Sequence, residues 1–213
     1  MAGGFVICEY GEVKAGFSEF KRTMDALRVS LIEKAEADWK PLTYTGRTKA
    51  NFAALGVTPG PGLQVQSRTF GESTIIPALF SGMGMATALT TWVQFLTATG
   101  SQTVLTGAGT SHSIAEDYKI GMAGIAILDK AVKISEIKLQ IGDKKLPRIN
   151  IEEAMAYDEP AVIFEEGFIL DEETAFDMYA YVQSIGYQKI KIIGLQLNRV
   201  YDKMLTNPGS ALT

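Results

Sequence analysis

Residues 176–200 read FDMYAYVQSIGYQKIKIIGLQLNRV and carry the clearest secondary-structure signal in the chain. Apolar side chains occupy every second position from Phe176 to Val182, as expected of a strand that buries one face. Ser184-Ile185-Gly186 then provides a turn, and residues 188–200 supply another β-rich segment. The stretch therefore predicts two β-strands joined by a short turn.

Alternation of the same kind extends upstream, over residues 118–141. Tyr118, Ile120 and Met122 fall on one face of a predicted strand. Farther along, the apolar positions change parity between Ile134 and Ile137. One extra residue in a strand produces such a slip, so we predict a β-bulge or a short turn at residues 135–136.

The region from about residue 43 to residue 115 is rich in Thr, Gly and Gln and has weaker strand patterns. We predict short strands at 43–45 and 63–66, separated by a Pro- and Gly-rich loop at 58–62. Residues 90–106 are dense in β-branched and aromatic side chains and predict two strands that turn at 98–101. Strands at this spacing favour a single antiparallel β-sandwich domain over residues 43–205.

An amphipathic helix is predicted over about residues 18–38, within an N-terminal arm formed by residues 1–42. Ser18 provides an N-cap, and Lys40-Pro41 provides a stop. The apolar stripe of the helix packs on the protein's own sheet or docks on a neighbouring subunit. It consists of Phe17, Phe20, Met24, Leu27 and Leu31. At the other end of the chain, residues 206–213 are predicted to form a flexible tail.

Residues 73–115 contain no Asp, Glu, Lys or Arg over 43 positions, although 21% of the chain is charged. A transmembrane helix over residues 75–96 is disfavoured by Pro77, Gly82 and Gly84 and by the lack of a basic flank. A membrane-inserting β-hairpin over residues 92–105 has only weak alternation. We favour burial between copies of the chain, because a strand of a monomer normally presents charges to solvent. Subunit contacts are thus predicted at the helix stripe and at Trp92 and Phe95.

Residues that support catalysis or metal binding are scarce. The only histidine is His112 and the only cysteine is Cys8, which excludes an intrachain disulfide and a multi-cysteine metal site. No catalytic or phosphate-binding motif is present, so we expect neither enzymatic activity nor a cofactor. An acidic stretch with ten carboxylates over residues 152–177 is the remaining candidate. Five of these residues are candidate Ca²⁺ ligands across a subunit boundary: Glu165, Glu166, Asp171, Glu172 and Glu173.

The net charge of the chain limits how it could bind nucleic acid. A net charge of −4 disfavours a surface devoted to nucleic-acid binding but allows one local basic face. Lys21, Arg22 and Arg28 on the predicted helix are the candidates for such a contact. No signal peptide is recognised at the N-terminus, so we expect synthesis and retention in the cytoplasm.

Taken together, the helical arm, the uncharged Thr- and Gly-rich strands and the closing strands at 176–182 and 188–200 resemble viral coat proteins of the β-sandwich, jelly-roll type. The resemblance covers most of the chain. It implies a mainly β, jelly-roll-like fold with an N-terminal amphipathic helix, and self-assembly of many identical copies into a shell or tube. It also implies a virion assembled in the host cytoplasm, contact with genome nucleic acid or an internal membrane, and no small-molecule substrate.

Two other functional classes remain open. A β-sandwich enzyme or carbohydrate-binding protein would use the acidic segment Glu165–Glu173, which we predict to be a loop. A membrane-active protein would instead insert the uncharged segment 73–115.

Overall fold

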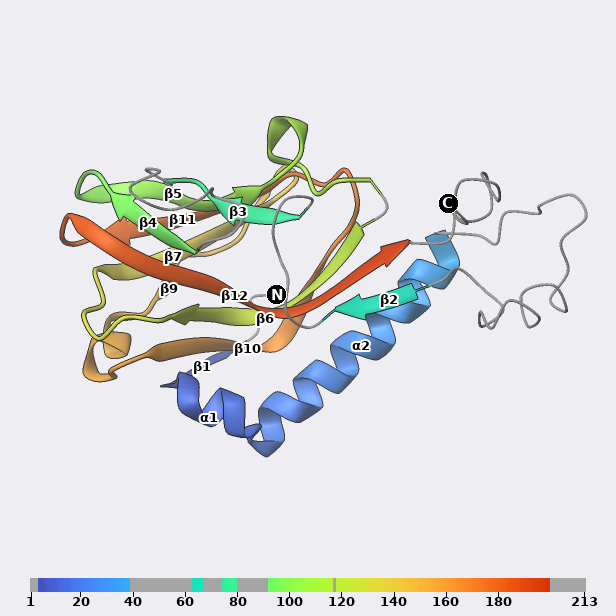
Figure 1. Cartoon of the computed structure of the whole chain (residues 1–213), viewed down its shortest axis with the longest axis horizontal. Coiled ribbons are helices and arrows are strands. Elements are labelled where there is room, and N and C mark those ends of the chain that lie inside the picture. Colours follow the sequence, from blue (N-terminus) through green and yellow to red (C-terminus); the bar gives the residue numbers. More distant parts are fainter. Residues whose placement is uncertain (1–3, 39–62, 67–73, 80–91, 117, 200–213) are drawn as a thin grey trace, which may run out of the picture.

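A computed structural model describes residues 4–38, 63–66, 74–79, 92–116 and 118–199 of the chain. This part is mainly β and forms two antiparallel sheets in a sandwich-like arrangement, with a long helix below them (Figure 1). The predicted strand at 43–45, the loop at 58–62 and the tail at 206–213 lie outside the described residues.

Each sheet contains six of the described strands. Sheet A has the order β1-β10-β6-β12-β2, and β4 also pairs with β12. Its strands are β1 (Phe5–Glu9), β2 (Leu63–Gln66), β4 (Val93–Leu96), β6 (Tyr118–Ile127), β10 (Pro160–Leu170) and β12 (Gly186–Arg199). Sheet B has the order β3-β5-β11-β7-β8, and β9 also pairs with β7. Its strands are β3 (Ile75–Pro77), β5 (Gly100–Gly107), β7 (Ile134–Ile141), β8 (Lys144–Lys145), β9 (Ile149–Asn150) and β11 (Phe176–Val182).

Two helices precede the second strand. Helix α1 (Tyr10–Ala15) ends at Gly16, whose φ of 72° lies in the left-handed region that favours glycine. Helix α2 (Ser18–Asp38) follows after two residues, Gly16 and Phe17. Two short 3₁₀ turns, η1 (Thr110–His112) and η2 (Glu152–Ala156), lie between strands.

The main core fills the space between the two sheets. The alternating apolar side chains of β11 point into it and are buried, from Phe176 to Val182. They meet buried side chains of β6 and β12, among them Met122 and Ile192. Burial of each of the larger apolar side chains, such as Phe176 and Met178, contributes about 1.5–3 kcal/mol. The strand alternation read from the sequence thus becomes the interior of the sandwich.

A second core lies between α2 and the outer face of sheet A. Helix α2 packs on β6, β10 and β12 and buries Leu27, Leu31 and Ala35. Leu27 sits where the sheet has small residues: a Cβ on Gly167 would lie 2.4 Å from Cδ1 of Leu27. The missing side chain therefore leaves the hollow that admits the leucine. The molecule has three layers, sheet B, sheet A and α2 (Figure 1).

The predicted irregularity at residues 135–136 is confirmed as a bulge in β7. Tyr181 of β11 pairs with Glu136, whereas Val182 pairs with Ile134, so Ser135 is the extra residue. The carbonyl of Ser135 accepts a hydrogen bond from the N–H of Ile151 at 2.8 Å, so the bulge anchors the segment that follows β9. The change of apolar parity in the sequence therefore located a real feature of the strand.

The prediction of an acidic loop over residues 165–173 is wrong for most of its length, because residues 165–170 belong to a strand. Glu165 and Glu166 lie inside β10, where the register with β6 shifts between Ile163 and Phe168. Strand β10 lies between the sandwich core and the α2 core, so both of its faces are covered and its sequence does not alternate. Only the residues from Asp171 onward form a turn.

The strands predicted within 90–106 are present as β4 and β5, but they do not pair with each other. Gly186 to Lys189 of β12 pairs with β4 in one sheet, while β5 pairs with β11 and β3 in the other. The turn at 97–99 therefore connects the two sheets, and Gly100 accommodates it with a φ of 98°.

Candidate assembly surfaces

The predicted helix stripe is packed within the chain. Leu27 and Leu31 are buried against sheet A, and Phe17, Phe20 and Met24 are partly buried against the same cluster. Of the two interpretations, packing on the protein's own sheet describes these contacts. Leu27 and Leu31 are consequently not available on the surface of the folded protomer.

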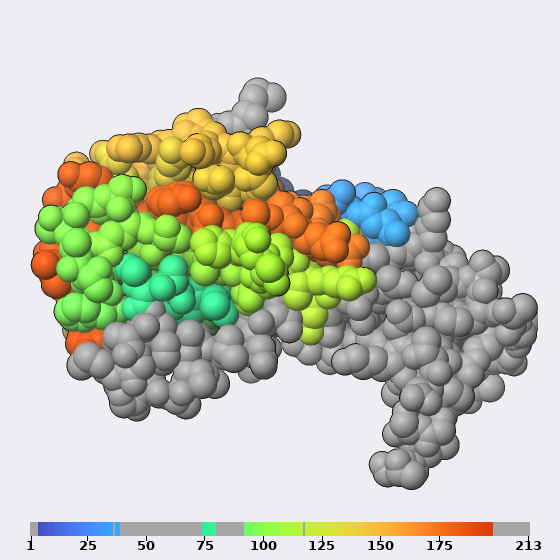
Figure 2. All heavy atoms as spheres, turned by 90° about the horizontal axis from the view of Figure 1, so that it is seen from above, coloured from blue at the N-terminus to red at the C-terminus, as the bar shows by residue number. Residues whose placement is uncertain are grey.

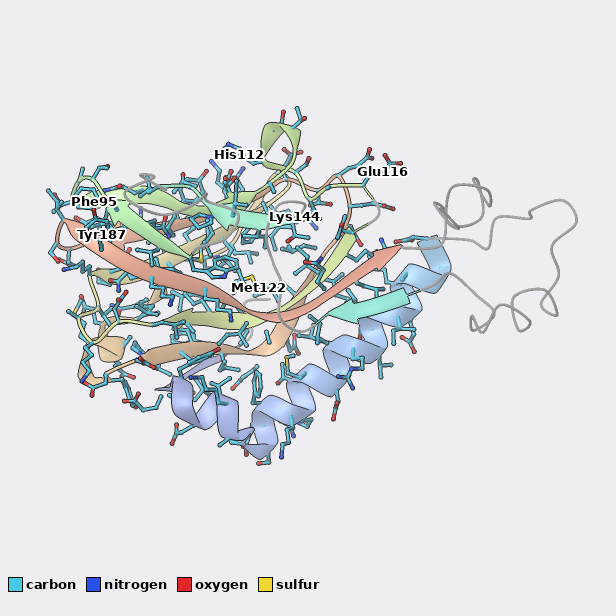
Figure 3. The ribbon with its side chains drawn as sticks, in the orientation of Figure 1. Phe95, His112, Glu116, Met122, Lys144 and Tyr187 are labelled. Atoms are coloured by element: carbon cyan, nitrogen blue, oxygen red, sulfur yellow. The ribbon has the colours of Figure 1, made fainter. Side chains whose placement is uncertain are left out.

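Trp92 and Phe95 lie at one end of the sandwich. Trp92 is half-buried and packs against the core between the sheets. Phe95 is directly opposite Tyr187 in the β4–β12 pairing, and the two rings meet edge to face with centroids 5.0 Å apart. Figure 3 shows both rings at the same end of the molecule.

The described residues of the uncharged segment 73–115 are partly buried in the core and partly exposed on the surface. Leu96, Val104 and Leu105 are fully buried, which accounts for part of the gap. The turn at 97–99 is exposed, and it lies beside the exposed turn at 183–185 because Gly100 pairs with Val182. Residues 178–188 also contain no charged side chain. Figure 2 looks onto sheet B and shows the segments 74–79 and 92–115 side by side.

We call these two turns and the residues that flank them the uncharged surface. Its large apolar side chains are exposed: Ile185 by 54%, Tyr181 by 41% and Tyr187 by 40%. Charged side chains border it, since Lys133 packs on Gly186 and Glu136 is opposite Tyr181. Exposed apolar groups with charges at their edge are typical of a protein interface. The surface is therefore a candidate for contact with another molecule.

The five candidate Ca²⁺ ligands divide into two groups. Glu165 in the β10 bulge accepts the backbone N–H of Gly4 at 3.1 Å. Asp171 is held by two lysines at the far end of the strand, and Glu172 and Glu173 follow it in a turn. Among the described residues, no three His, Cys, Asp or Glu side chains are placed to hold a metal ion together.

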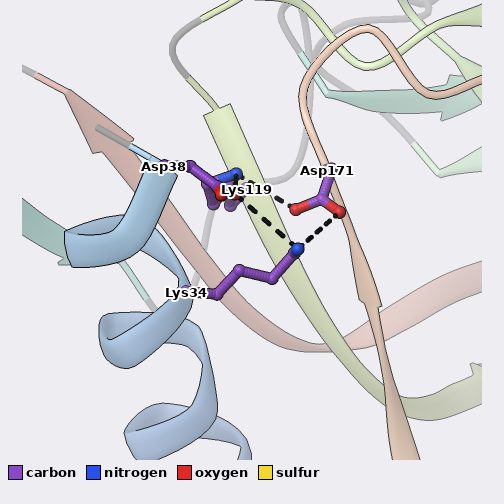
Figure 4. Close-up of polar contacts among 4 residues, drawn as sticks. All are labelled: Lys34, Asp38, Lys119 and Asp171. Carbon is purple, nitrogen blue, oxygen red and sulfur yellow. Dashed lines mark hydrogen bonds and ion pairs between the residues drawn. The ribbon is translucent and has the colours of Figure 1, made fainter. Parts of the chain in front are cut away.

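The lysines at Asp171 belong to a network of four side chains, of which only Lys119 is fully buried (Figure 4). The ammonium of Lys119, on β6, lies 2.7 Å from Oδ2 of Asp38 and 3.0 Å from Oδ1 of Asp171. Lys34 approaches the same carboxylates at 3.6 Å and 3.2 Å. Charges of opposite sign alternate around the group, so each carboxylate meets two cations.

The environment of Lys119 explains why it stays charged. Its side chain is only 1% exposed. Burial lowers its pKa, but the hydrogen bonds to Asp38 and Asp171 outweigh burial and raise the pKa above the ordinary lysine value. The hydrogen bond from Lys119 in turn lowers the pKa of Asp38. The network fixes the C-terminal end of α2 on sheet A. Asp171 takes part in it through its ion pairs with Lys34 and Lys119.

Sequence reasoning missed a second polar pair. Nδ1 of His112 lies 2.8 Å from Oδ1 of Asp177 on the outer face of sheet B. Ser111 and His112 have φ values of 55° and 63°, and a Cβ on Gly107 would collide with the His112 carbonyl at 2.0 Å. A tight loop therefore presents this histidine. No local signal predicts the contact, because it depends on the pairing of β5 with β11.

The candidate nucleic-acid residues are exposed on α2. Lys21, Arg22 and Arg28 point away from sheet A, and the first two border a shallow hollow with Asp25 and Val29. The acidic side chain among them reduces the local positive potential. This face of the helix carries both signs of charge.

No protein-family model, curated protein or solved structure matches the chain. Among the described residues, no helix has both the length and the apolar character needed to cross a bilayer. The case for a function therefore rests on the strand order and on the surfaces described above.

Proposed function

We propose that this chain is a self-assembling structural protein, the coat subunit of a virion, built on a jelly roll. The observation that carries the proposal is the order of the strands in the two sheets. Localisation in a virion and contact with a genome or an internal membrane are parts of the same proposal.

Eight of the twelve described strands form the relevant pattern, and β1, β2, β3 and β9 lie outside it. In chain order the eight are β4, β5, β6, β7, β8, β10, β11 and β12. In a jelly roll, one sheet places the first strand beside the eighth, followed by the third and the sixth. The other sheet places the second beside the seventh, followed by the fourth and the fifth. The order β4-β12-β6-β10 facing β5-β11-β7-β8 follows this rule. Jelly rolls are frequent in viral capsids, and also in lectins and cupins.

The uncharged surface favours assembly within this group of functions. A subunit that associates with copies of itself needs exposed apolar groups that water does not solvate strongly. Ile185 and Tyr187 provide such groups beside turns that carry no charge. Nucleic-acid contact through Lys21, Arg22 and Arg28 would use the opposite layer, because α2 covers sheet A.

The two rival functions have less support. An enzyme or carbohydrate-binding protein based on residues 165–173 would need free, converging carboxylates, whereas Asp171 is paired with Lys34 and Lys119. A membrane-active protein would have to withdraw Leu96 and Val104 from the core before inserting the uncharged segment. That withdrawal would cost much of the energy that stabilises the sandwich.

The test is the state of association of the purified full-length chain. Size-exclusion chromatography with light scattering should give a mass many times that of one subunit, and negative-stain microscopy should show regular particles. A monomer at micromolar concentration over a range of salt and pH would overturn the proposal.

A further inference from the structure

Four segments meet at one end of the sandwich, which we call the loop end. They are the turn at 97–99, the loop at 128–133, the segment 151–159 and the turn at 183–187. A backbone hydrogen bond joins the second and the fourth of these segments, because the N–H of Gln183 donates to the carbonyl of Lys133 at 2.7 Å. The third segment is tied to the start of β7, where the N–H of Ile151 donates to the carbonyl of Ser135 at 2.8 Å. These contacts bring the segments to the same end of the sandwich.

The loop at 128–133 presents positive charge. Its one acidic residue, Asp129, faces inward and accepts hydrogen bonds from the side chain of Gln188, at 2.8 Å, and from the backbone of Lys189. Lys130 is exposed and Lys133 is half-buried. The outward charge of this loop thus comes from its two lysines.

The neighbouring segment 151–159 presents negative charge. It exposes four carboxylates, Glu152, Glu153, Asp158 and Glu159. The sequence has no Lys or Arg from residue 149 to residue 188 to balance them. Among the described residues, no ion pair within 4.0 Å joins these carboxylates to Lys130 or Lys133. Two adjacent loops of opposite sign therefore remain open to an outside partner.

Apolar side chains complete the surface. Met155, in η2, is 45% exposed, and the strongly exposed Ile185 lies on the turn at 183–187. Apolar groups surrounded by charged loops have the composition of an interface with a dry centre and a polar rim. This arrangement gives association energy from the apolar groups and orientation from the charges.

We propose that the loop end is a contact between copies of this chain, in which the basic loop 128–133 of one subunit meets the acidic segment 151–159 of the next. The argument is charge complementarity: a surface with adjacent patches of both signs is complementary to itself. A second copy neutralises both patches at once, whereas a nucleic acid would be repelled by the four carboxylates. The inference rests on the proposed self-assembly and names the surface that performs it.

Charge reversal tests the contact in the full-length chain. The double variant Lys130→Glu/Lys133→Glu places glutamates against the acidic segment of the next copy. The double variant Glu152→Lys/Glu153→Lys places two lysines against its basic loop and cancels the net negative charge of the segment. Each should raise the protein concentration needed for assembly by at least about tenfold at low salt. The variant with all four substitutions sets the new glutamates of one copy against the new lysines of the next and should assemble again. Equal mixtures of the two double variants should also assemble, because each then meets a partner of opposite sign.

The controls separate folding from association. Lys144→Glu/Lys145→Glu changes the same charge at β8, which pairs with the other end of β7, away from the loop end (Figure 3). It should assemble like the wild type. Because the Lys133 side chain packs on Gly186, the single variant Lys130→Glu provides a second reversal in an exposed side chain. Circular dichroism should show the wild-type spectrum for every variant.

The outcomes distinguish the two proposals. If the wild type forms particles and the double variants do so at the same concentration, the loop end is not the contact, although self-assembly stands. If the folded fourfold variant does not recover assembly, charge pairing between copies is also refuted. If the wild type remains a monomer, the proposed function itself fails.

Discussion

Replacement of Lys119 by methionine should destabilise the protein by removing the buried centre of this four-residue network. Methionine keeps most of the apolar stem, so the change mainly deletes the ammonium group. Two charge-assisted hydrogen bonds are lost, to Asp38 and to Asp171. Each bond of this kind contributes about 1.5–3 kcal/mol.

The exposure of the two aspartates reduces the stability that is lost when the Lys119 ammonium is removed. The side chains of Asp38 and Asp171 are 41% and 34% exposed, so water solvates them again once the ammonium is gone. Lys34 also remains beside both carboxylates. We therefore expect a loss of about 2 kcal/mol rather than the full cost of breaking a buried ion pair. A loss of this size should lower the Tm by about 4–8 °C for a chain of this length.

The assay is urea unfolding followed by far-UV circular dichroism, with Lys34→Met as the matched control. Lys34 reaches the same two carboxylates but is 39% exposed, so its removal should cost at most about 1 kcal/mol. Hydrogen exchange should rise most in residues 31–38, at the end of α2 that the network holds. Equal losses for the two variants, or unchanged exchange at that end, would refute the argument from burial.

The same network predicts how the difference between wild type and Lys119→Met depends on pH. The lowered pKa of Asp38 means that its contribution is present above about pH 4, the ordinary value for aspartate, and disappears as the pH falls through the folded-state pKa. The raised pKa of Lys119 means that its contribution is complete below about pH 10 and disappears as the pH rises through the folded-state pKa. The stability difference should therefore be flat between these limits and shrink outside both.

Three further substitutions test the packing. Leu27→Ala should cost about 2–5 kcal/mol in urea unfolding, because it empties the hollow over Gly167. Gly167→Ala should also destabilise the wild type, since its Cβ would lie 2.4 Å from Leu27, yet it should cost little in the Leu27→Ala background; additive losses would show that the two residues do not share this space. Trp92→Lys should lower the free energy of unfolding of the isolated subunit by about 2 kcal/mol, and with it the urea midpoint, because this half-buried ring packs against the core. An unchanged midpoint combined with lost assembly would place Trp92 at a subunit contact instead.

Strands that have one solvent-facing side were predictable from the sequence. Strand β11 begins and ends where the alternation does, and the parity change in β7 marks the bulge at Ser135. Both lie in sheet B, whose outer face is open, so polar side chains alternate with apolar ones. The physical cause of the pattern is exposure of one face only.

Strands covered on both sides were harder to recognise. Strand β10 carries the continuous apolar run Ala161 to Phe164. Sheet A has the sandwich core on one face and α2 on the other, which removes the alternation that identifies a strand. The glutamates in the β10 bulge then read as part of a loop.

The sequence alone determined the local features of this protein: the strand periods, the helix, the bulge and the stretch without charge. Each of these depends on residues close together in the chain. Only the tertiary structure decided which sheet each strand joins, and which side chains far apart in sequence meet. Lys119 finds Asp38 and Asp171, and His112 finds Asp177, through strand pairing and helix packing over long distances. Local periodicity contains no information about such contacts, because it reports which face is buried and not what buries it.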